Sequence, residues 1–81
     1  REAGVITVLY FASLRDAAGM DCEQLPLPCS LPALYEQLRA RHRLPLPRER
    51  LRVAIDGAFC AWDAPVPDGA EVAFIPPVSG G

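Results

Sequence analysis

The residues best suited to chemistry are the last two of the chain, Gly80 and Gly81, which follow Pro76-Pro77-Val78-Ser79. Glycine has no side chain, so this segment can approach another surface closely and adopt dihedrals that other residues disfavour. Five residues from Pro77 to Gly81 can extend over roughly 16 Å. A terminal carboxylate on such a thread can enter the pocket of another protein. The alternative is a frayed terminus without function, which is the commonest fate of chain ends.

The two prolines, Pro76 and Pro77, indicate where the folded part stops. Proline has a fixed φ and cannot donate a hydrogen bond to a sheet. We therefore expect one globular domain over residues 1–77 and an extended tail over residues 78–81.

Composition and charge describe a small globular protein. The chain has 81 residues, of which 51% are hydrophobic and 22% are charged, and this suits a single domain. The net charge of −2 gives no general attraction to nucleic acid or to an anionic membrane. The longest apolar stretch, residues 5–12, is far too short to span a bilayer. We predict neither nucleic acid nor membrane as a partner.

The basic side chains are all arginines, and the absence of lysine means that the chain cannot receive its own C-terminus as an isopeptide. Six of the eight arginines fall between residues 39 and 52. Acidic residues are interspersed and no aromatic stacking pattern accompanies them, which favours a solvated basic face over a phosphate-binding patch. A role of this face in binding an acidic partner stays open.

The thiols and the single imidazole do not predict an active site. Cys22, Cys29 and Cys60 match no zinc or CxxC spacing, and their odd number argues against a disulfide framework. Reduced thiols in the cytoplasm are the simplest interpretation. His42 lies in the arginine run, so a Cys–His nucleophile is disfavoured. We expect this chain to bind no metal and no cofactor.

Hydrophobic patterns predict the elements of the first half of the chain. Residues 5–11 form a strand whose phase Ile6, Val8 and Tyr10 faces the core. Residues 12–18 form a short helical turn that ends at Gly19. Residues 22–28 form a strand at a sheet edge, because this segment contains two prolines.

The main helix is expected to begin after Ser30, a good N-cap followed by Leu31-Pro32. Its apolar face repeats with helical spacing and contains Leu31, Leu34, Tyr35 and Leu38. Basic residues at 39–43 end it, where positive charge suits the helix dipole. Further strands are predicted at residues 51–55, 59–62 and 71–75, the first two joined by an Asp56-Gly57 turn.

This order of elements, ββαβββ, favours an α+β fold with one mixed sheet packed on one main helix. The first and last strands are the most apolar, so we place them side by side at the sheet centre. Their outward phase contains Leu9, Phe11 and Ile75, with Phe59 expected to join them. These apolar groups predict a docking surface, or else loops cover them.

Two segments of the chain resemble the small subunits of molybdopterin synthase, which are ubiquitin-like sulfur carriers with a β-grasp fold. They are residues 8–19 (VLYFASLRDAAG) and 68–81 (DGAEVAFIPPVSGG). The chain departs from the family pattern at Ala70, where aspartate is usual, and at Asp56, where asparagine is frequent. Both positions lie in turns, so the departures put local hydrogen bonds in doubt.

The resemblance implies a chemistry for the tail. An activating enzyme would use ATP to adenylate Gly81, and a sulfur donor would displace AMP and leave a C-terminal thiocarboxylate. The tail would then enter the large synthase subunit, where two such sulfurs convert cyclic pyranopterin monophosphate into the dithiolene of molybdopterin. Gly81 would be the reacting residue, with Gly80 beside it. Partner contacts would come from Phe11, Phe59, Ile75, Pro76, Pro77, Val78 and Ser79.

On this interpretation the chain is a sulfur-donating subunit, and the acid–base groups belong to its partners, because the sequence offers no pair that could run a reaction alone. The family usually forms a heterotetramer with the large subunit. Three alternatives stay open: a carrier for thiamine, cysteine or tRNA thiolation; a modifier that attaches Gly81 to lysines; and an interaction domain with an inert tail. The stretch Pro76-Pro77-Val78-Ser79 favours the molybdopterin branch.

Overall fold

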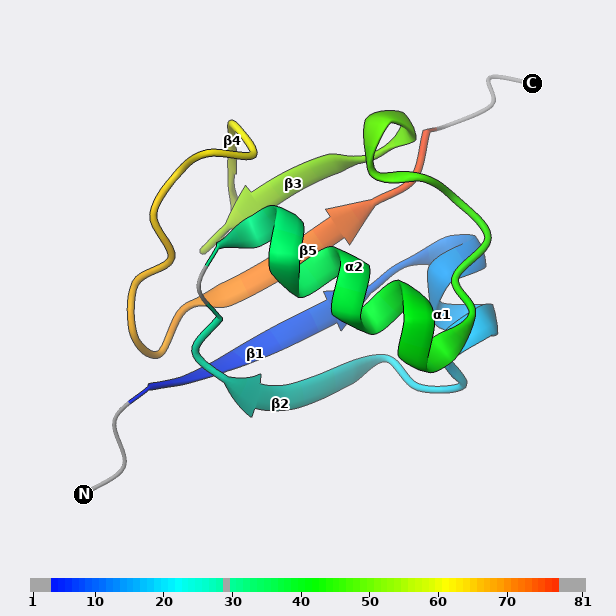
Figure 1. Cartoon of the computed structure of the whole chain (residues 1–81), viewed down its shortest axis with the longest axis horizontal. Helices are drawn as coiled ribbons and strands as arrows, with labels where there is room; N and C mark the ends of the chain where they lie inside the picture. The colour runs from blue at the N-terminus through cyan, green and yellow to red at the C-terminus, as the bar shows by residue number, and fades with distance from the viewer. Residues whose placement is uncertain (1–3, 29, 78–81) are drawn as a thin grey trace.

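The computed structural model describes residues 4–28 and 30–77. Within them, strands and helices follow the order shown in Figure 1: β1 (Val5–Tyr10), α1 (Ala12–Ala18), β2 (Cys22–Pro26), α2 (Leu31–His42), the 3-10 helix η1 (Arg48–Arg50), β3 (Arg52–Ile55), β4 (Ala58–Cys60) and β5 (Glu71–Ile75). The predicted α+β class is confirmed. Of the predicted tail, residues 78–81 lie outside the described residues.

The strands form one mixed sheet in the order β2-β1-β5-β3-β4. The first and last strands, β1 and β5, lie side by side and parallel at its centre, as the sequence predicts, with Tyr10 opposite Phe74. All other neighbours are antiparallel. The β2 strand lies at an edge, where its prolines are tolerated. Since β5 is central, the chain leaves the sheet from its middle at Pro76 and Pro77 (Figure 1).

Local sequence signals account for both ends of α2. The hydroxyl of Ser30 accepts a hydrogen bond from the Ala33 amide at 3.2 Å, which satisfies one free donor of the first turn. The C-cap after His42 is Arg43, whose φ of 55° is left-handed and whose amide donates to the Arg39 carbonyl. In α1 the corresponding residue is Gly19, at φ 76°. The predicted caps Ser30 and Gly19 are thus confirmed.

Element bounds differ from the prediction at several places. The strand predicted to reach Phe11 ends at Tyr10, because Phe11 is the N-cap of α1 and its carbonyl accepts from the Leu14 amide at 3.0 Å. The strand predicted over 22–28 stops at Pro26, and the one predicted over 59–62 occupies Ala58–Cys60. The 3-10 helix η1, which follows Pro47, was not predicted. Because of it, β3 begins at Arg52 and not at residue 51.

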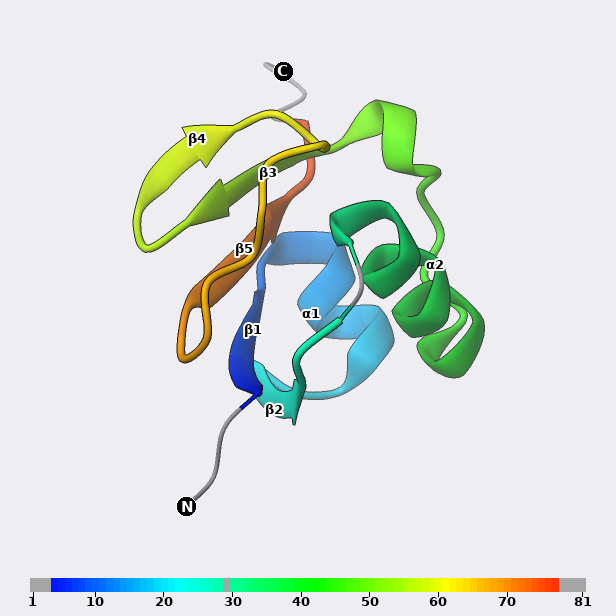
Figure 2. The same cartoon turned by 60° about the vertical axis from the view of Figure 1, so that its left-hand side comes forward.

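Both helices cover the same side of the sheet, with α2 lying across it (Figure 2). Between the layers, the core includes the predicted inward phase of β1, which is Ile6, Val8 and Tyr10, together with the apolar face of α2. Around Phe74 of β5, the ring centroids of Tyr35 and Trp62 lie 5.1 and 5.8 Å away. Among the described residues no helix covers the opposite side of the sheet, where Phe59 is exposed and Ala54 and Ala73 are buried.

Both turns that depart from the family pattern contain hydrogen bonds. Asp56 has a left-handed φ of 51°, and its Oδ1 accepts from the Glu71 amide at 2.9 Å. Asp68 Oδ1 accepts from the amides of Gly4 and Val5 at 2.8 and 3.1 Å. Ala70 is buried and its amide donates to the Pro67 carbonyl. Asp56 and Ala70 are therefore both compatible with hydrogen-bonded turns.

Candidate functional site

Strand register builds a row of side chains across the helix-free face. Leu9 of β1 pairs with Ala73 of β5, Ala73 with Ala54 of β3, and Ala54 with Phe59 of β4. Because paired residues point to the same face of a sheet, all four side chains share one side. Two small alanines lie between two large apolar groups, so the row is low in the middle and raised at both ends.

A second row lies nearer the end of β5. Ile75 pairs with Arg52 across β5 and β3. Tyr10 of β1 pairs with Phe74 of β5. Phe11 and Ile75 are the next residues after this pair, so Phe11 lies beside the end of the same row. Phe59 and Phe11 are 61% and 44% exposed, and Ile75 is partly buried. We define the docking face as these two rows together: Leu9, Phe11, Arg52, Ala54, Phe59, Ala73 and Ile75.

The structure brings four of the predicted partner-binding residues together in one groove, where the chain leaves the sheet. They are Phe59, Ile75, Pro76 and Pro77. Pro76 is buried and Pro77 is exposed, so the first proline is anchored in the domain and the second is free to be contacted. We call this the exit groove.

Phe11, also predicted to bind a partner, lines a separate groove with Leu9, Arg15 and Cys22. The remaining predicted residues, Val78, Ser79, Gly80 and Gly81, lie outside the described residues.

Sequence reasoning missed Arg52 as a member of this face. Its guanidinium carbon lies 4.6 Å from the centre of the Phe59 ring, which is the geometry of a cation–π contact. The alternation of β3 carried the signal, because Arg52 and Ala54 share a phase and the Asp56-Gly57 turn pairs Ala54 with Phe59.

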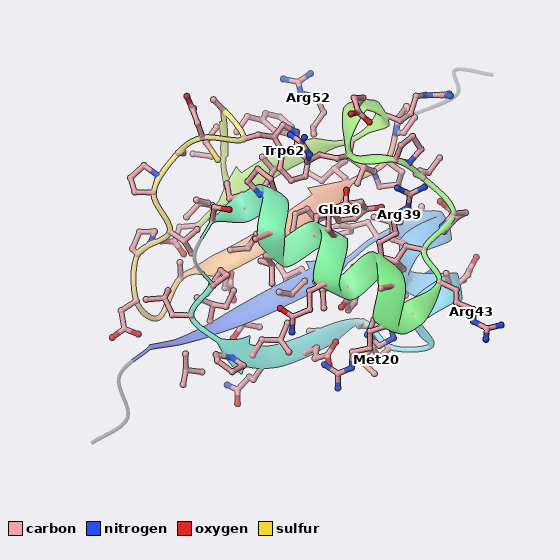
Figure 3. All side chains as sticks on the ribbon, in the orientation of Figure 1. Met20, Glu36, Arg39, Arg43, Arg52 and Trp62 are labelled. Atoms are coloured by element: carbon pink, nitrogen blue, oxygen red, sulfur yellow. The ribbon has the colours of Figure 1, made fainter. Side chains whose placement is uncertain are left out.

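The arginines from 39 to 52 do not form the single basic face that the sequence suggested. Arg39 lies 3.9 Å from Glu36 on the exposed side of α2. Arg48 lies over Trp62, on the helix side, whereas Arg52 lies over Phe59. Figure 3 shows Glu36 and Arg39 on α2, with Arg52 well apart from them. The arginines therefore divide between two sides of the sheet.

A partly buried polar cluster joins α2 to the edge strand. Glu23, whose side chain is 10% exposed, accepts from Tyr10 at 2.9 Å, lies 3.0 Å from Nε2 of His42, and pairs with Arg41 at 2.9 Å. Partial burial acts to raise the pKa of Glu23, but the hydrogen bonds from His42 and Tyr10 and the charge of Arg41 outweigh it and hold that pKa below its ordinary value. His42 thus serves the fold.

Of the described thiols, that of Cys60 is poorly placed for nucleophilic catalysis. Cys60 directs its thiol at the Val53 carbonyl, 3.8 Å away, and burial raises the pKa of Cys60. Cys22 is exposed, and both are free cysteines.

Over residues 4–28 and 30–77, no group of three or more His, Cys, Asp or Glu side chains could hold a metal ion. In the same part of the chain, no helix combines the length and apolarity needed to cross a bilayer.

Comparison with known proteins supports the predicted family of sulfur carriers. The ThiS family model matches residues 8–81. The molybdopterin synthase sulfur carrier subunit of Escherichia coli strain K12 is 36% identical over 81 residues, which cover 95% of this chain and 100% of that protein.

Solved structures share the fold. The putative molybdopterin converting factor subunit 1 of Pyrococcus furiosus has a TM-score of 0.76 at 29% identity, covering 93% of this chain and 99% of that one. SAMP1 of Haloferax volcanii has a TM-score of 0.79 at 24% identity, covering 96% and 100%. A protein–protein complex of subunits 1 and 2 of the molybdopterin-converting factor from Helicobacter pylori contains a chain with a TM-score of 0.68 at 19% identity, covering 95% and 99%.

These likenesses confirm the predicted ubiquitin-like β-grasp fold and the resemblance to molybdopterin synthase small subunits. Given the model match over residues 8–81 and the full-length likeness to the Escherichia coli protein, this chain belongs to the ThiS family.

Proposed function

We propose that this chain is the sulfur carrier subunit of a molybdopterin synthase. The observation that carries the proposal is the 36% identity to the Escherichia coli sulfur carrier subunit over that protein's whole length. The position of the docking face supports it, because this face adjoins the point where the chain leaves the sheet. The proposal places the reaction in the cytoplasm, and the free thiols of Cys22 and Cys60 are compatible with that compartment.

The reacting residue in this proposal is Gly81. A carboxylate is a poor electrophile, so an activating enzyme transfers AMP from ATP to the Gly81 carboxyl and releases pyrophosphate. A sulfur donor then displaces AMP and leaves a thiocarboxylate. This chain binds no cofactor itself, since the ATP belongs to the activating enzyme. The thiocarboxylate sulfur is a competent nucleophile at neutral pH, so the chain carries it in a transferable form.

The large synthase subunit is the proposed acceptor of the tail. Val78, Ser79 and Gly80 thread its pocket, and Gly81 delivers sulfur to cyclic pyranopterin monophosphate. Groups for acid–base chemistry come from that subunit, and the two kinds of subunit form a heterotetramer. In support, a chain of this fold occurs in the complex of subunits 1 and 2 of the molybdopterin-converting factor from Helicobacter pylori.

Residues of the folded domain have positioning roles in this mechanism. Phe11, Phe59 and Ile75 bury apolar area against the partner, which is the main favourable term in association. Pro76 is fixed in the domain and Pro77 has a restricted φ, so the direction of the tail is set before binding. A thread that is aligned in advance loses less conformational freedom when it enters a pocket.

Reconstitution with the large subunit, an activating enzyme, ATP and a sulfur donor tests the proposal. Intact-mass measurement of the wild-type protein is expected to show a chain that ends at Gly81 and gains one oxygen-to-sulfur exchange. A Gly81→Ala variant should fold normally but lose most sulfur transfer, because a methyl group obstructs the narrow path. A Gln37→Ala variant, altered on the exposed side of α2, serves as the control.

Normal molybdopterin formation with Gly81→Ala would contradict the mechanism, as would a wild-type C-terminus that never gains sulfur. Transfer of the sulfur to a thiamine, cysteine or tRNA pathway would keep the carrier class and change the product. Covalent adducts on lysines of other proteins would instead identify a protein modifier.

A further inference from the structure

The exit groove combines apolar and basic groups, and this combination bears on which partner it accepts. Its apolar part is Phe59, Ile75, Pro76 and Pro77, and its basic part is Arg50 and Arg52. Both arginines are exposed. Groove and docking face are continuous, because Phe59, Ile75 and Arg52 belong to both. A protein that takes the tail therefore meets these charges as it covers the apolar groups.

Arg52 has no acidic partner among the residues that the structure describes. Arg15, Arg39 and Arg41 each pair with a carboxylate. In the described part of the chain, Arg52 and Arg50 form no ion pair, and the groove holds one carboxylate, Glu49, beside the two guanidinium groups. The groove thus has an excess of one positive charge. An apolar surface with an uncompensated cation complements a partner surface that carries an anion.

The contact between Arg52 and Phe59 prepares that cation for binding. The guanidinium lies over the aromatic ring, with its carbon 4.6 Å from the ring centre. Stacking engages the flat face of the guanidinium, whereas its N–H donors lie around the edge and remain free. A carboxylate accepts two of these donors side by side, and such charge-assisted pairs are stronger than neutral hydrogen bonds. Because the ring limits the rotamers of Arg52, less side-chain freedom is lost on binding.

We propose that Arg52 is a specificity-determining residue that binds an aspartate or glutamate carboxylate of the large synthase subunit at the edge of the docking face. This inference rests on the proposed function, because it takes the large subunit as the occupant of the groove. The apolar groups supply affinity, and the Arg52–carboxylate pair fixes the register in which the tail meets its pocket. A partner that is basic at this position would be rejected, because a buried, unpaired Arg52 is costly.

Binding of the full-length chain to the purified large subunit, titrated from low to high salt, tests this. Arg52→Gln keeps side-chain length and removes the charge, and Arg43→Gln is the matched control on an exposed arginine beyond the end of α2 (Figure 3). We expect Arg52→Gln to weaken binding about fivefold to tenfold at low salt, with a smaller difference at high salt. The Arg43→Gln variant should bind within about twofold of wild type, because its charge lies away from the groove.

Arg52→Lys separates charge from stacking. It keeps the charge but lacks the planar group, so its affinity should fall between wild type and Arg52→Gln, with the salt dependence of the wild type. Equal affinity and equal salt dependence of Arg52→Gln and Arg43→Gln, while the wild type binds, would overturn the inference and leave the proposed function intact. Failure of the wild type to bind the large subunit would overturn both. Sedimentation of the chain alone gives a further test: a dimer that Arg52→Gln abolishes would assign the groove to a second copy and overturn the inference.

Discussion

The hydroxyl of Tyr10 donates a hydrogen bond to Oε1 of Glu23 at 2.9 Å, and this side-chain contact adds to the backbone pairing of the central strand β1 with the edge strand β2. The same carboxylate pairs with His42 and Arg41 at the end of α2. Three elements therefore meet at Glu23. Since β1 also carries Leu9 on the docking face, this cluster supports the sheet from the side opposite to that face.

Replacing Glu23 by alanine should destabilise the fold. The substitution removes the acceptor of Tyr10 and leaves the partly buried His42 and the exposed Arg41 without their anion, and losses of this kind are worth roughly 2–3 kcal/mol. Chemical denaturation measures the change in the free energy of unfolding. Gln24→Ala, on the neighbouring exposed residue of β2, is the control and should cost under about 0.5 kcal/mol. Equal losses for the two variants would argue against the cluster.

Stability should also depend on pH through Glu23. Partial burial opposes the charged form, but hydrogen bonds from His42 and Tyr10 and the charge of Arg41 prevail, so the folded-state pKa of Glu23 is lowered. A lowered carboxylate pKa contributes stability that is fully present above the unfolded value, about 4.3, and is lost as pH falls through the folded value.

The difference in unfolding free energy between wild type and Glu23→Gln isolates this contribution from the other carboxylates. It should shrink as pH is lowered from about 6 to about 3, because protonation neutralises Glu23 in the wild type only. Denaturation curves at a series of pH values measure it. A difference that stays constant over this range would show that ionised Glu23 has no special role.

Local patterns predicted much of the fold because their physical causes are local. The alternation of Ile6, Val8 and Tyr10 reflects a strand with one buried side, and the capping by Ser30 involves residues three apart. Adjacency of β1 and β5 followed from a single argument, that the most apolar strands belong at the sheet centre. The resemblance supplied the fold family, which composition and periodicity left open.

Contacts between residues distant in the sequence could not be predicted from those local patterns. Glu23 and His42 are nineteen residues apart, and nothing in the sequence near Glu23 specifies that partner. Arg52 was grouped with neighbouring arginines because sequence proximity hides the side of the sheet to which a side chain points. The 3-10 turn at Arg48–Arg50 was missed since three residues give no period to detect. Gly81, the proposed reacting residue, stays a prediction.

Phe11 can be tested for partner binding without harming the fold. It is the N-cap of α1, and aspartate is a good N-cap residue, so Phe11→Asp should fold normally. The new charge is buried without a partner if the large subunit covers this position, so binding should weaken at least about tenfold. Leu27→Asp is the matched control: Leu27 is 40% exposed, against 44% for Phe11, and its amide bonds to Gly4 beyond the opposite end of β1. Equal affinity of the two variants in a calorimetric titration would exclude Phe11 from the interface.

Cys60 should react with alkylating agents more slowly than Cys22. Burial raises the pKa of Cys60 and so reduces its thiolate fraction, and its thiol is turned toward the Val53 carbonyl. Cys22 is exposed on β2.

In a Cys29→Ser variant, trypsin separates the two thiols into different peptides, so iodoacetamide labelling at each site can be followed by mass spectrometry. We expect Cys22 to be labelled about tenfold faster in the folded protein. The ratio should approach one in concentrated urea, where both environments are lost. Equal labelling rates at both sites in the folded protein would mean that β4 opens faster than the reagent reacts. The hairpin of β3 and β4 would then hold Phe59 far less rigidly than the structure indicates.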